Sequence, residues 1–221
     1  MSTRKNPAAA ALPHESAPVR ADAAMVRRCL EFAAVCDVRY YLNGVCITPS
    51  KSGGVLIIGA DGYTMLVLHD PDGRADKETI LPLSKRAHKA ALGAKDTEYV
   101  CADTDGRIWF STLFGIPTFQ VVGKPIEGKF PDFTRVVPPL SECVQGLPGA
   151  FNLAYLRRVL DDTADSKYAG IRFYYRKGHE NDGMMLARVK DGLAAVMPLW
   201  TEESLRNLPD DFLRTAPEAS A

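Results

Sequence analysis

The side chains that could carry out catalysis are scattered along the sequence. The four histidines are His14, His69, His88 and His179. None has the spacing of a metal site with cysteine or carboxylate residues. The chain also lacks the glycine-rich phosphate loop of nucleotide-binding proteins and the Gly-x-Ser-x-Gly motif of hydrolases. The acidic cluster of Asp161, Asp162 and Asp165 falls at the end of a predicted helix, where water is the expected neighbour. We therefore expect no enzymatic activity, no cofactor and no metal.

Basic residues recur in groups on three predicted helices. They are Arg27 and Arg28, then Lys85, Arg86 and Lys89, then Arg157 and Arg158. A charged group on a helix usually lies on a solvated face. Long basic side chains can also contact the phosphates of duplex DNA without reading its bases. Both interpretations remain open from the residues alone.

Composition describes an ordinary globular chain of 221 residues, 46% hydrophobic and 24% charged. Lys plus Arg and Asp plus Glu both number 27, so any affinity for DNA must come from local clustering. The odd number of cysteines and the lack of a Cys-x-x-Cys pair predict buried, reduced thiols. No apolar run is long enough for a membrane span and no signal sequence is recognisable, so we expect a cytoplasmic protein. The cysteines are Cys29, Cys36, Cys46, Cys101 and Cys143.

The positioning elements begin with a helix after Asp22, a residue that favours helix capping. Residues 39–47 then predict an aromatic and apolar strand, and residues 58–67 predict a hairpin. The hairpin turns at Asp61-Gly62, because this dipeptide favours the left-handed turn conformation.

The same order of elements recurs twice more. The second unit has a strand at 79–83, a helix from Ser84 to Gly93, and strands at 98–102, 107–111 and 116–122. The third unit starts at 150–153, continues as a helix through Tyr155 and Leu160, and ends with strands at 170–176, 183–189 and 193–199. A repeat of about sixty residues predicts three units that must pair to cover their apolar faces.

Three stretches resemble one known family. The run 39–67 resembles the middle domain of the bacterial DNA polymerase III beta subunit, the beta sliding clamp. Residues 128–139, which contain Gly-Lys-Phe-Pro-Asp-Phe, are similar to the interdomain connector of that family, and residues 195–199 are similar to its C-terminal strand. The resemblance covers about residues 20–200 and implies an α+β, DNA-clamp-like fold, with antiparallel sheets outside and helices on one face.

The resemblance also suggests a domain division. Two units correspond to the middle domain of the family and the third to the second half of its last domain, whereas its first domain and the first half of its third have no counterpart. The expected parts are a flexible arm at 1–18, a complete clamp-like domain of two units at 19–127, a connector at 128–145, a half-domain at 146–200, and a partly helical tail at 201–221.

In the family, a cleft between these parts binds a short apolar peptide motif. The resemblance implies a corresponding cleft formed by Leu42, Gly62, Met65, Pro131, Arg135, Val136, Asn152, Tyr155, Val196, Met197, Pro198 and Leu199. The apolar members could instead be ordinary core residues. Tyr63 and Thr64 stand where the family has His and Arg, and Ala60 stands in place of Thr, which affects motif preference. The resemblance further implies that the basic helix faces meet duplex DNA.

We therefore expect a clamp-like replication protein, a processivity factor or hub. Its partners would be duplex DNA and polymerase subunits, clamp-loader subunits or other proteins that carry clamp-binding motifs. The alternative is a non-encircling clamp mimic or adaptor that competes for those clients. Because the third unit has no evident partner in its own chain, we also expect a homo-oligomer in which third units pair.

Overall fold

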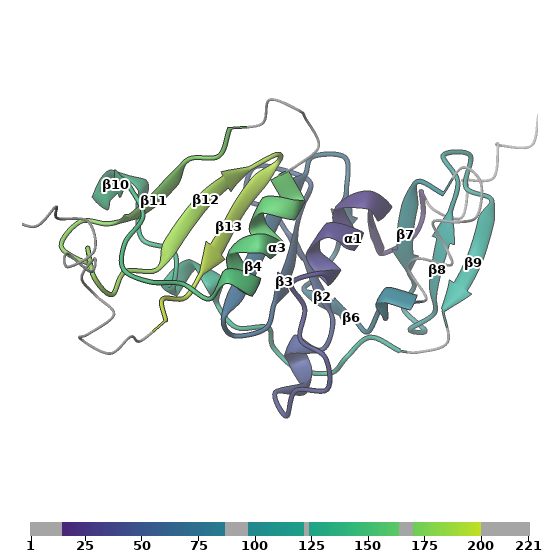
Figure 1. Ribbon diagram of the computed structural model, residues 1–221. Coiled ribbons are helices and arrows are strands. Elements are labelled where there is room, and N and C mark those ends of the chain that lie inside the picture. Colours follow the sequence, from purple (N-terminus) through teal and green to yellow (C-terminus); the bar gives the residue numbers. More distant parts are fainter. Residues whose placement is uncertain (1–14, 87–96, 122–123, 164–169, 200–221) are drawn as a thin grey trace, which may run out of the picture.

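Two antiparallel sheets organise the described part of the chain, which comprises residues 15–86, 97–121, 124–163 and 170–199 of the computed structural model (Figure 1). The first sheet has the order β5 (Arg74–Ala75), β1 (Val19–Asp22), β7 (Tyr99–Ala102), β8 (Ile108–Ser111), β9 (Pro117–Val121). The second has the order β10 (Cys143–Gln145), β11 (Phe173–Arg176), β12 (Met185–Val189), β13 (Gly192–Val196), β4 (Thr64–Asp70), β3 (Val55–Ala60), β2 (Val45–Pro49), β6 (Thr79–Leu81).

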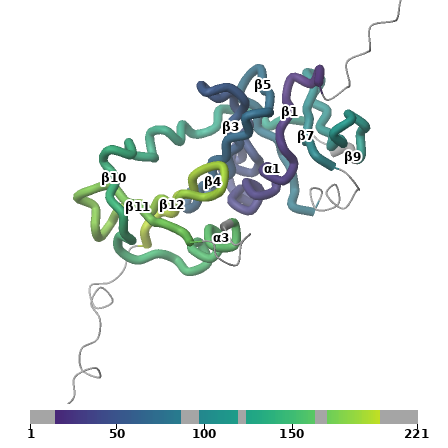
Figure 2. The backbone as a smooth tube through the Cα atoms, turned by 90° about the horizontal axis from the view of Figure 1, so that it is seen from above, coloured from purple at the N-terminus to yellow at the C-terminus, as the bar shows by residue number. Residues whose placement is uncertain are grey.

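The helices lie on one face of this framework. They are α1 (Ala23–Leu30) and α3 (Leu153–Thr163), with three short 3₁₀ turns among the described residues, η1 (Tyr40–Leu42), η2 (Phe133–Arg135) and η3 (Leu140–Glu142). Seen from above, α1 and α3 lie on the same side of the second sheet (Figure 2). No helix in the described ranges is both long and apolar enough to cross a membrane.

The first two units exchange their opening strands. β1 opens the first unit and pairs with β7 of the second unit, whereas β6 opens the second unit and pairs with β2 of the first. Each sheet therefore contains strands from both units. Because of this exchange, neither unit can complete its own sheet alone.

The third unit joins the first unit through β13, which pairs antiparallel with β4 over five residues from Gly192 opposite Leu68 to Val196 opposite Thr64. At its other side, β10 pairs with β11, the position that an exchanged opening strand occupies in the first two units. The prediction that the third unit has no partner within its own chain is therefore wrong. The reason is that residues assigned to the connector supply β10, while the open edge of β4 receives β13.

The helix α1 begins where the sequence predicts. Asp22 accepts a hydrogen bond from the backbone N–H of Met25 at 2.8 Å, which satisfies one of the free donors of the first turn. Val26, Cys29 and Leu30 are buried on the face toward β3 and β4. One core cluster contains this face together with residues of α3, β12 and β13, so the first and third units share a continuous core.

One predicted strand is shorter than expected, since only residues 45–47 of the stretch 39–47 belong to β2, and another is absent from the described chain. Residues 40–42 form η1, because the Asn43 side chain accepts from the Asp37 N–H and donates to the Asp37 carbonyl, which turns the chain before β2. Residues 150–153 form no strand, because Asn152 accepts a hydrogen bond from the Ala154 N–H and starts α3. The helix after Ser84 is described only for Lys85 and Arg86, and the arm to residue 14 and the tail from 200 lie outside the described residues.

The five cysteines are all free thiols. Cys29, Cys46 and Cys101 are buried, as expected, whereas Cys36 is exposed and Cys143 is half-buried. Burial raises the pKa of the Cys101 thiol to about 11 and raises those of Cys29 and Cys46 further. The three buried thiols therefore stay protonated at neutral pH.

Close packing of α1 on β3 depends on Gly59. A methyl group there would overlap the carbonyl oxygen of Cys29 in α1. We expect Gly59→Ala to lower the free energy of unfolding by about 1–3 kcal/mol, because the helix must move away from the sheet. Urea denaturation measures this loss. Gly170→Ala is the matched control, since no atom of the described residues lies within 4 Å of the added methyl group, and an equal effect of both changes would contradict this account.

Candidate functional site

An apolar cavity of about 200 Å³ lies on the outer face where the first and third units join. Its lining comes from β4, β13, η1 and the chain around η2. Six residues of the predicted cleft line it, namely Leu42, Gly62, Met65, Pro131, Val136 and Met197. The other lining residues are Arg39, Tyr41, Ala60, Tyr63, Thr64, Phe130, Phe133, Met184 and Ala195.

Strand pairing builds the floor of this cavity. Met65 lies opposite Ala195 across the β4–β13 pair, and both belong to the core cluster on the face away from the helices. Leu42 and Phe130 pack into the same cluster. Met197 is 41% exposed, and its backbone N–H donates to the Tyr63 carbonyl at 2.8 Å. A flexible, apolar side chain is thereby held beside the tip of the β3–β4 hairpin.

The remaining predicted residues do not line the cavity. Val196 is fully buried in the core beneath the helices, and its neighbour Ala195 lines the cavity instead. The physical reason is the alternation of side chains along β13, which sends adjacent residues to opposite faces. Arg135 is exposed and lines a neighbouring hollow, and Asn152 caps α3.

Tyr155 reaches the cavity only through another side chain. Its ring stacks on the ring of Tyr63 with centroids 5.6 Å apart, and Tyr63 lines the cavity. Pro198 and Leu199 follow Met197 along the chain. Leu199 is 49% exposed, and its backbone N–H donates to the Ala150 carbonyl at 2.8 Å.

Some lining residues were absent from the prediction. Phe130 and Phe133 belong to the connector motif that carried the resemblance, and its two aromatic positions were the available signal. Met184 lies next to buried Met185, so alternation along β12 could have assigned it to the cavity face. Arg39 and Tyr41 gave no such signal, because the predicted strand at 39–47 is interrupted by η1.

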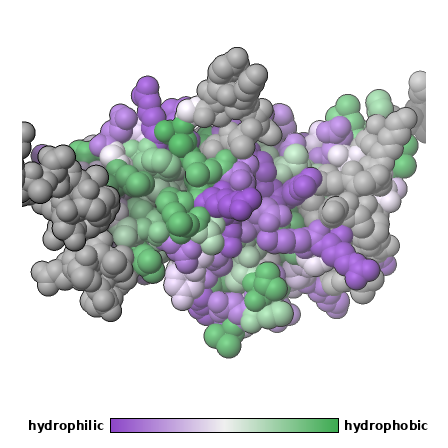
Figure 3. All heavy atoms as spheres, in the orientation of Figure 1, coloured by the Kyte–Doolittle hydropathy of each residue, from purple (hydrophilic) through white to green (hydrophobic). Residues whose placement is uncertain are grey.

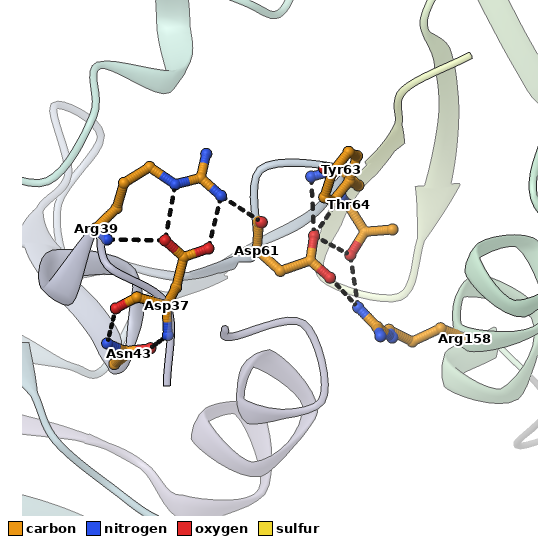
Figure 4. A network of polar contacts seen from close by, with 7 residues as sticks. All are labelled: Asp37, Arg39, Asn43, Asp61, Tyr63, Thr64 and Arg158. Carbon is orange, nitrogen blue, oxygen red and sulfur yellow. Dashed lines mark hydrogen bonds and ion pairs between the residues drawn. The ribbon is translucent and has the colours of Figure 1, made fainter. Parts of the chain in front are cut away.

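Asp61 fixes the hairpin at the edge of the cavity (Figure 4). One carboxylate oxygen accepts from the backbone N–H groups of Tyr63 and Thr64 and from the Thr64 hydroxyl, at 2.7–3.0 Å. The other accepts from Arg158 of α3 at 2.6 Å. Burial acts to raise the pKa of Asp61, but these hydrogen bonds outweigh it and lower the pKa below its ordinary value. The third unit thus holds the rim of the cavity through one charged contact.

A second arginine approaches the same hairpin from the other side. Asp37 holds Arg39 through two hydrogen bonds of 2.7 and 3.0 Å, and this pairing lowers the pKa of Asp37 to about 2. Arg39 also donates to the Asp61 carbonyl at 3.1 Å. Gly62 has a φ of +88° and lies against the Arg39 guanidinium, so both its conformation and its surroundings favour glycine.

The predicted DNA-binding residues fall into two groups. Arg28 donates to Asp162 of α3 at 2.8 and 2.9 Å and to the Lys190 carbonyl at 2.8 Å, so it ties α1 to the third unit. Arg158 ties α3 to the first unit as described above. The exposed members are Arg27, Lys85, Arg86 and Arg157, with Lys85 paired to Glu31 and Arg157 to Asp161. Lys89 lies outside the described residues.

Hydrophilic side chains gather over α1, whereas hydrophobic ones gather over α3 and the adjacent strands (Figure 3). The helix side of the molecule is therefore not uniformly basic. Within the described ranges, no group of three or more His, Cys, Asp or Glu side chains could hold a metal ion.

The Arg158–Asp61 pair should stabilise the junction between units. Asp61 has a lower pKa in the folded protein than in the unfolded chain, so its contribution is full above about pH 4, the unfolded value, and is lost as the pH falls through the folded pKa. We expect Asp61→Asn and Arg158→Met each to lower the free energy of unfolding by about 1–3 kcal/mol at pH 7.

Urea denaturation of the wild type, both single variants and the double variant tests this pair. The double variant should lower the free energy of unfolding by less than the sum of the two single decreases, because both changes remove the same contact. The difference between wild type and Asp61→Asn should shrink below pH 4. A difference that is independent of pH, with additive single effects, would show that the ion pair does not stabilise the junction.

Comparison with known proteins bears on this architecture. No family model matches the chain. The chain is 29% identical to a beta sliding clamp of Pseudomonas putida over 145 aligned residues. This alignment covers 64% of the chain and 38% of the Pseudomonas protein. The chain therefore spans well under half the length of this curated relative.

Solved structures agree on the fold. The DNA polymerase III subunit beta of Pseudomonas aeruginosa superposes with a TM-score of 0.59 at 19% identity, over 90% of this chain and 70% of that one. The Caulobacter crescentus polymerase III beta protein superposes with a TM-score of 0.57 at 18% identity, over 91% of this chain and 70% of that one. The DNA polymerase III subunit beta of Borrelia burgdorferi superposes with a TM-score of 0.60 at 9% identity, over 83% of this chain and 62% of that one. The described strand pairing and these matches together confirm that this chain resembles a shortened bacterial beta sliding clamp.

Proposed function

We propose that this chain is a clamp-like replication protein whose apolar cavity binds short peptide segments of its partners. The partners would be DNA polymerase and clamp-loader subunits, or other proteins that carry clamp-binding motifs. The observation that supports this proposal most directly is the cavity itself, which lies at the junction of the two parts that the resemblance assigns to the peptide cleft. The chain spans only 38% of its curated relative, yet it includes both parts.

The chemistry of the cavity favours an apolar peptide. Met65, Met184 and Met197 can adjust their unbranched side chains to different ligands, and Phe130 and Phe133 add aromatic surface. The volume suits one or two large side chains and is too small for a helix. A peptide that places a Leu-Phe pair in the cavity would remove apolar surface from water on both partners.

The rim suggests that motif preference differs from that of the relatives. Tyr63 is 56% exposed and stacks on Tyr155, so it presents an aromatic edge with a hydroxyl group rather than a basic side chain. The guanidinium of Arg39 lies beside Gly62, where Asp37 neutralises much of its charge. The polar end of a bound peptide would therefore meet hydrogen-bonding groups more than net charge.

The second part of the proposal is weak binding of duplex DNA through the exposed residues of the helix side. Arg27, Arg86 and Arg157 are exposed arginines and would make the phosphate contacts. The engagement of Arg28 and Arg158 in ion pairs reduces the charge available to DNA. This observation favours the second candidate function, a clamp mimic or adaptor that does not encircle DNA and competes for the clients of a clamp.

The peptide proposal predicts that a fluorescent peptide with the pattern Gln, Leu, then a Leu-Phe pair binds the cavity. Its dissociation constant should be on the order of micromolar, because the conformational entropy that a short flexible peptide loses on binding offsets much of the favourable binding free energy. Met197→Asp should weaken binding at least tenfold, since it places a charge at an apolar site. Leu140→Asp is the control, because Leu140 is 79% exposed and is not part of the cavity lining. Fluorescence anisotropy that detects no binding to the wild type at high protein concentration would refute the proposal.

The DNA proposal predicts sequence-independent binding that weakens steeply with salt. Each phosphate contact that is lost should reduce the slope of log affinity against log salt by about 0.9. The double variant Arg27→Glu/Arg157→Glu should therefore bind more weakly and with a smaller slope. Arg188→Glu supplies a charge-reversal control, because alternation along β12 puts Arg188 on the face away from the helices. Equal binding by the double variant and the wild type would favour the non-encircling adaptor.

A further inference from the structure

The last described residues of the chain lie beside the apolar cavity. Met197 lines the cavity, and its backbone N–H donates to the Tyr63 carbonyl at 2.8 Å, which fixes this part of the chain at the rim. Leu199, two residues further on, is fixed in the same way by the Ala150 carbonyl at 2.8 Å. The residues from 200 onward therefore start within about 7 Å of Met197, since two residues of extended chain span no more than this.

The sequence beyond this point contains a pair of large apolar residues, Phe212 and Leu213. The helix that the sequence predicts in this tail is interrupted at Pro209, because proline lacks the backbone N–H that a helix needs. The pair is therefore not bound into one helix with the residues before it. The cavity is too small for a helix but suits one or two large side chains, so its volume of about 200 Å³ matches the pair.

The pair is close enough along the chain to return to the cavity. Phe212 follows Leu199 by thirteen residues, and a flexible chain of this length has a root-mean-square end-to-end distance of roughly 20 Å. Such a tether gives an effective concentration of about 1 mM, so a ligand with a dissociation constant of about 100 μM would fill the cavity in roughly nine chains out of ten. Even a weak ligand on this tether would thus compete with free peptides.

We propose that Phe212 and Leu213 of this same chain occupy the apolar cavity and compete there with the peptides of partner proteins. The inference rests on the proposed function, because it assigns a second ligand to the same cavity. The unbranched side chains of Met65, Met184 and Met197 would adjust to the pair as they would to the peptide of a partner. Only a partner with higher affinity or with further contacts would displace the tail, so the tail would exclude weak clients.

Charge complementarity favours the same occupant. Asp210 and Asp211 directly precede the apolar pair. The exposed Arg135 lies in a hollow that adjoins the cavity, because Val136 and Met184 line both. The two carboxylates of this hollow are already in contact with basic side chains, Glu142 with Arg176 and Asp182 with His179. With the pair in the cavity, the carboxylates of the tail would lie near the Arg135 guanidinium, where opposite charges attract.

Methyl NMR of the full chain tests this docking without any partner peptide. The aromatic ring of Phe212 should shift the methyl signal of Met197, and the double variant Phe212→Asp/Leu213→Asp should lose this shift. Met25 is the internal reference, since it packs against the core on the helix side of the sheets. Identical Met197 signals in the wild type and the double variant would overturn the proposal.

Binding of the fluorescent client peptide gives an independent measurement. Phe212→Asp/Leu213→Asp should bind it about tenfold more tightly than the wild type, because the tethered competitor is removed. The micromolar value expected for the wild type includes this competition. Ala216→Asp/Ala219→Asp is the matched control, since it adds the same two charges to the tail and keeps the apolar pair, and it should bind as the wild type does.

The two measurements separate this inference from the proposed function. Equal peptide binding by the wild type and the Phe212→Asp/Leu213→Asp variant would overturn the inference and leave the proposed function intact. Absence of peptide binding to every variant, with a Met197 shift that still depends on the pair, would support docking of the tail and refute the proposed function.

Protein concentration distinguishes docking within one chain from docking into a second copy. The Met197 shift should be the same at every concentration, because the tether moves with its own cavity. A shift that grows with concentration, together with an increase in mass by light scattering, would place the pair in the cavity of another copy and would overturn docking within one chain.

Discussion

The antiparallel pairing of β4 with β13 is the interaction on which the rest of this structure depends. It brings a strand near residue 65 against one near residue 195, and the ten backbone positions involved fix the register of the two units. Once this register is set, Met65 and Ala195 face outward together while Leu66 and Ala194 face the helices together. The cavity and the shared core are thus two faces of the same strand pair.

A sheet that is assembled from exchanged strands tolerates the loss of whole units at defined places. Each unit needs one strand from outside itself to complete its sheet, and the third unit obtains it from β10. The third unit needs only three residues of connector for this purpose, because a single short strand satisfies the backbone groups of β11. Shortening of a clamp-like chain is therefore compatible with a closed set of strand pairs around the cleft.

Ion pairs also hold the junction between the first and third units. Arg28 and Arg158 are two of the residues that recur on the helices, and each makes a charge-assisted contact with the other unit. Arg158 also lies over the rings of Phe32 and Tyr155, at 5.8 and 5.9 Å from their centroids. Planar guanidinium groups suit such positions, since they stack on rings and donate to a carboxylate at once. The third unit is consequently held to the first by the β4–β13 strand pair and by the ion pairs of Arg28 and Arg158.

The sequence by itself determined the local elements and their order. The Asp61-Gly62 turn, the Asp22 cap, the three repeated units and the connector motif all depend on residues close to one another in the chain. The family resemblance carried by the runs 39–67, 128–139 and 195–199 then implied the clamp-like fold and six residues of the cavity lining. Only the tertiary structure decided that Val196 is core while Ala195 is surface, that η1 interrupts the strand at 39–47, that β10 completes the third unit, and that Arg28 and Arg158 are bound to carboxylates. These features depend on contacts between residues far apart in the sequence: a shift of one residue in strand register reverses every side chain, and a charged residue has no partner until the units are joined.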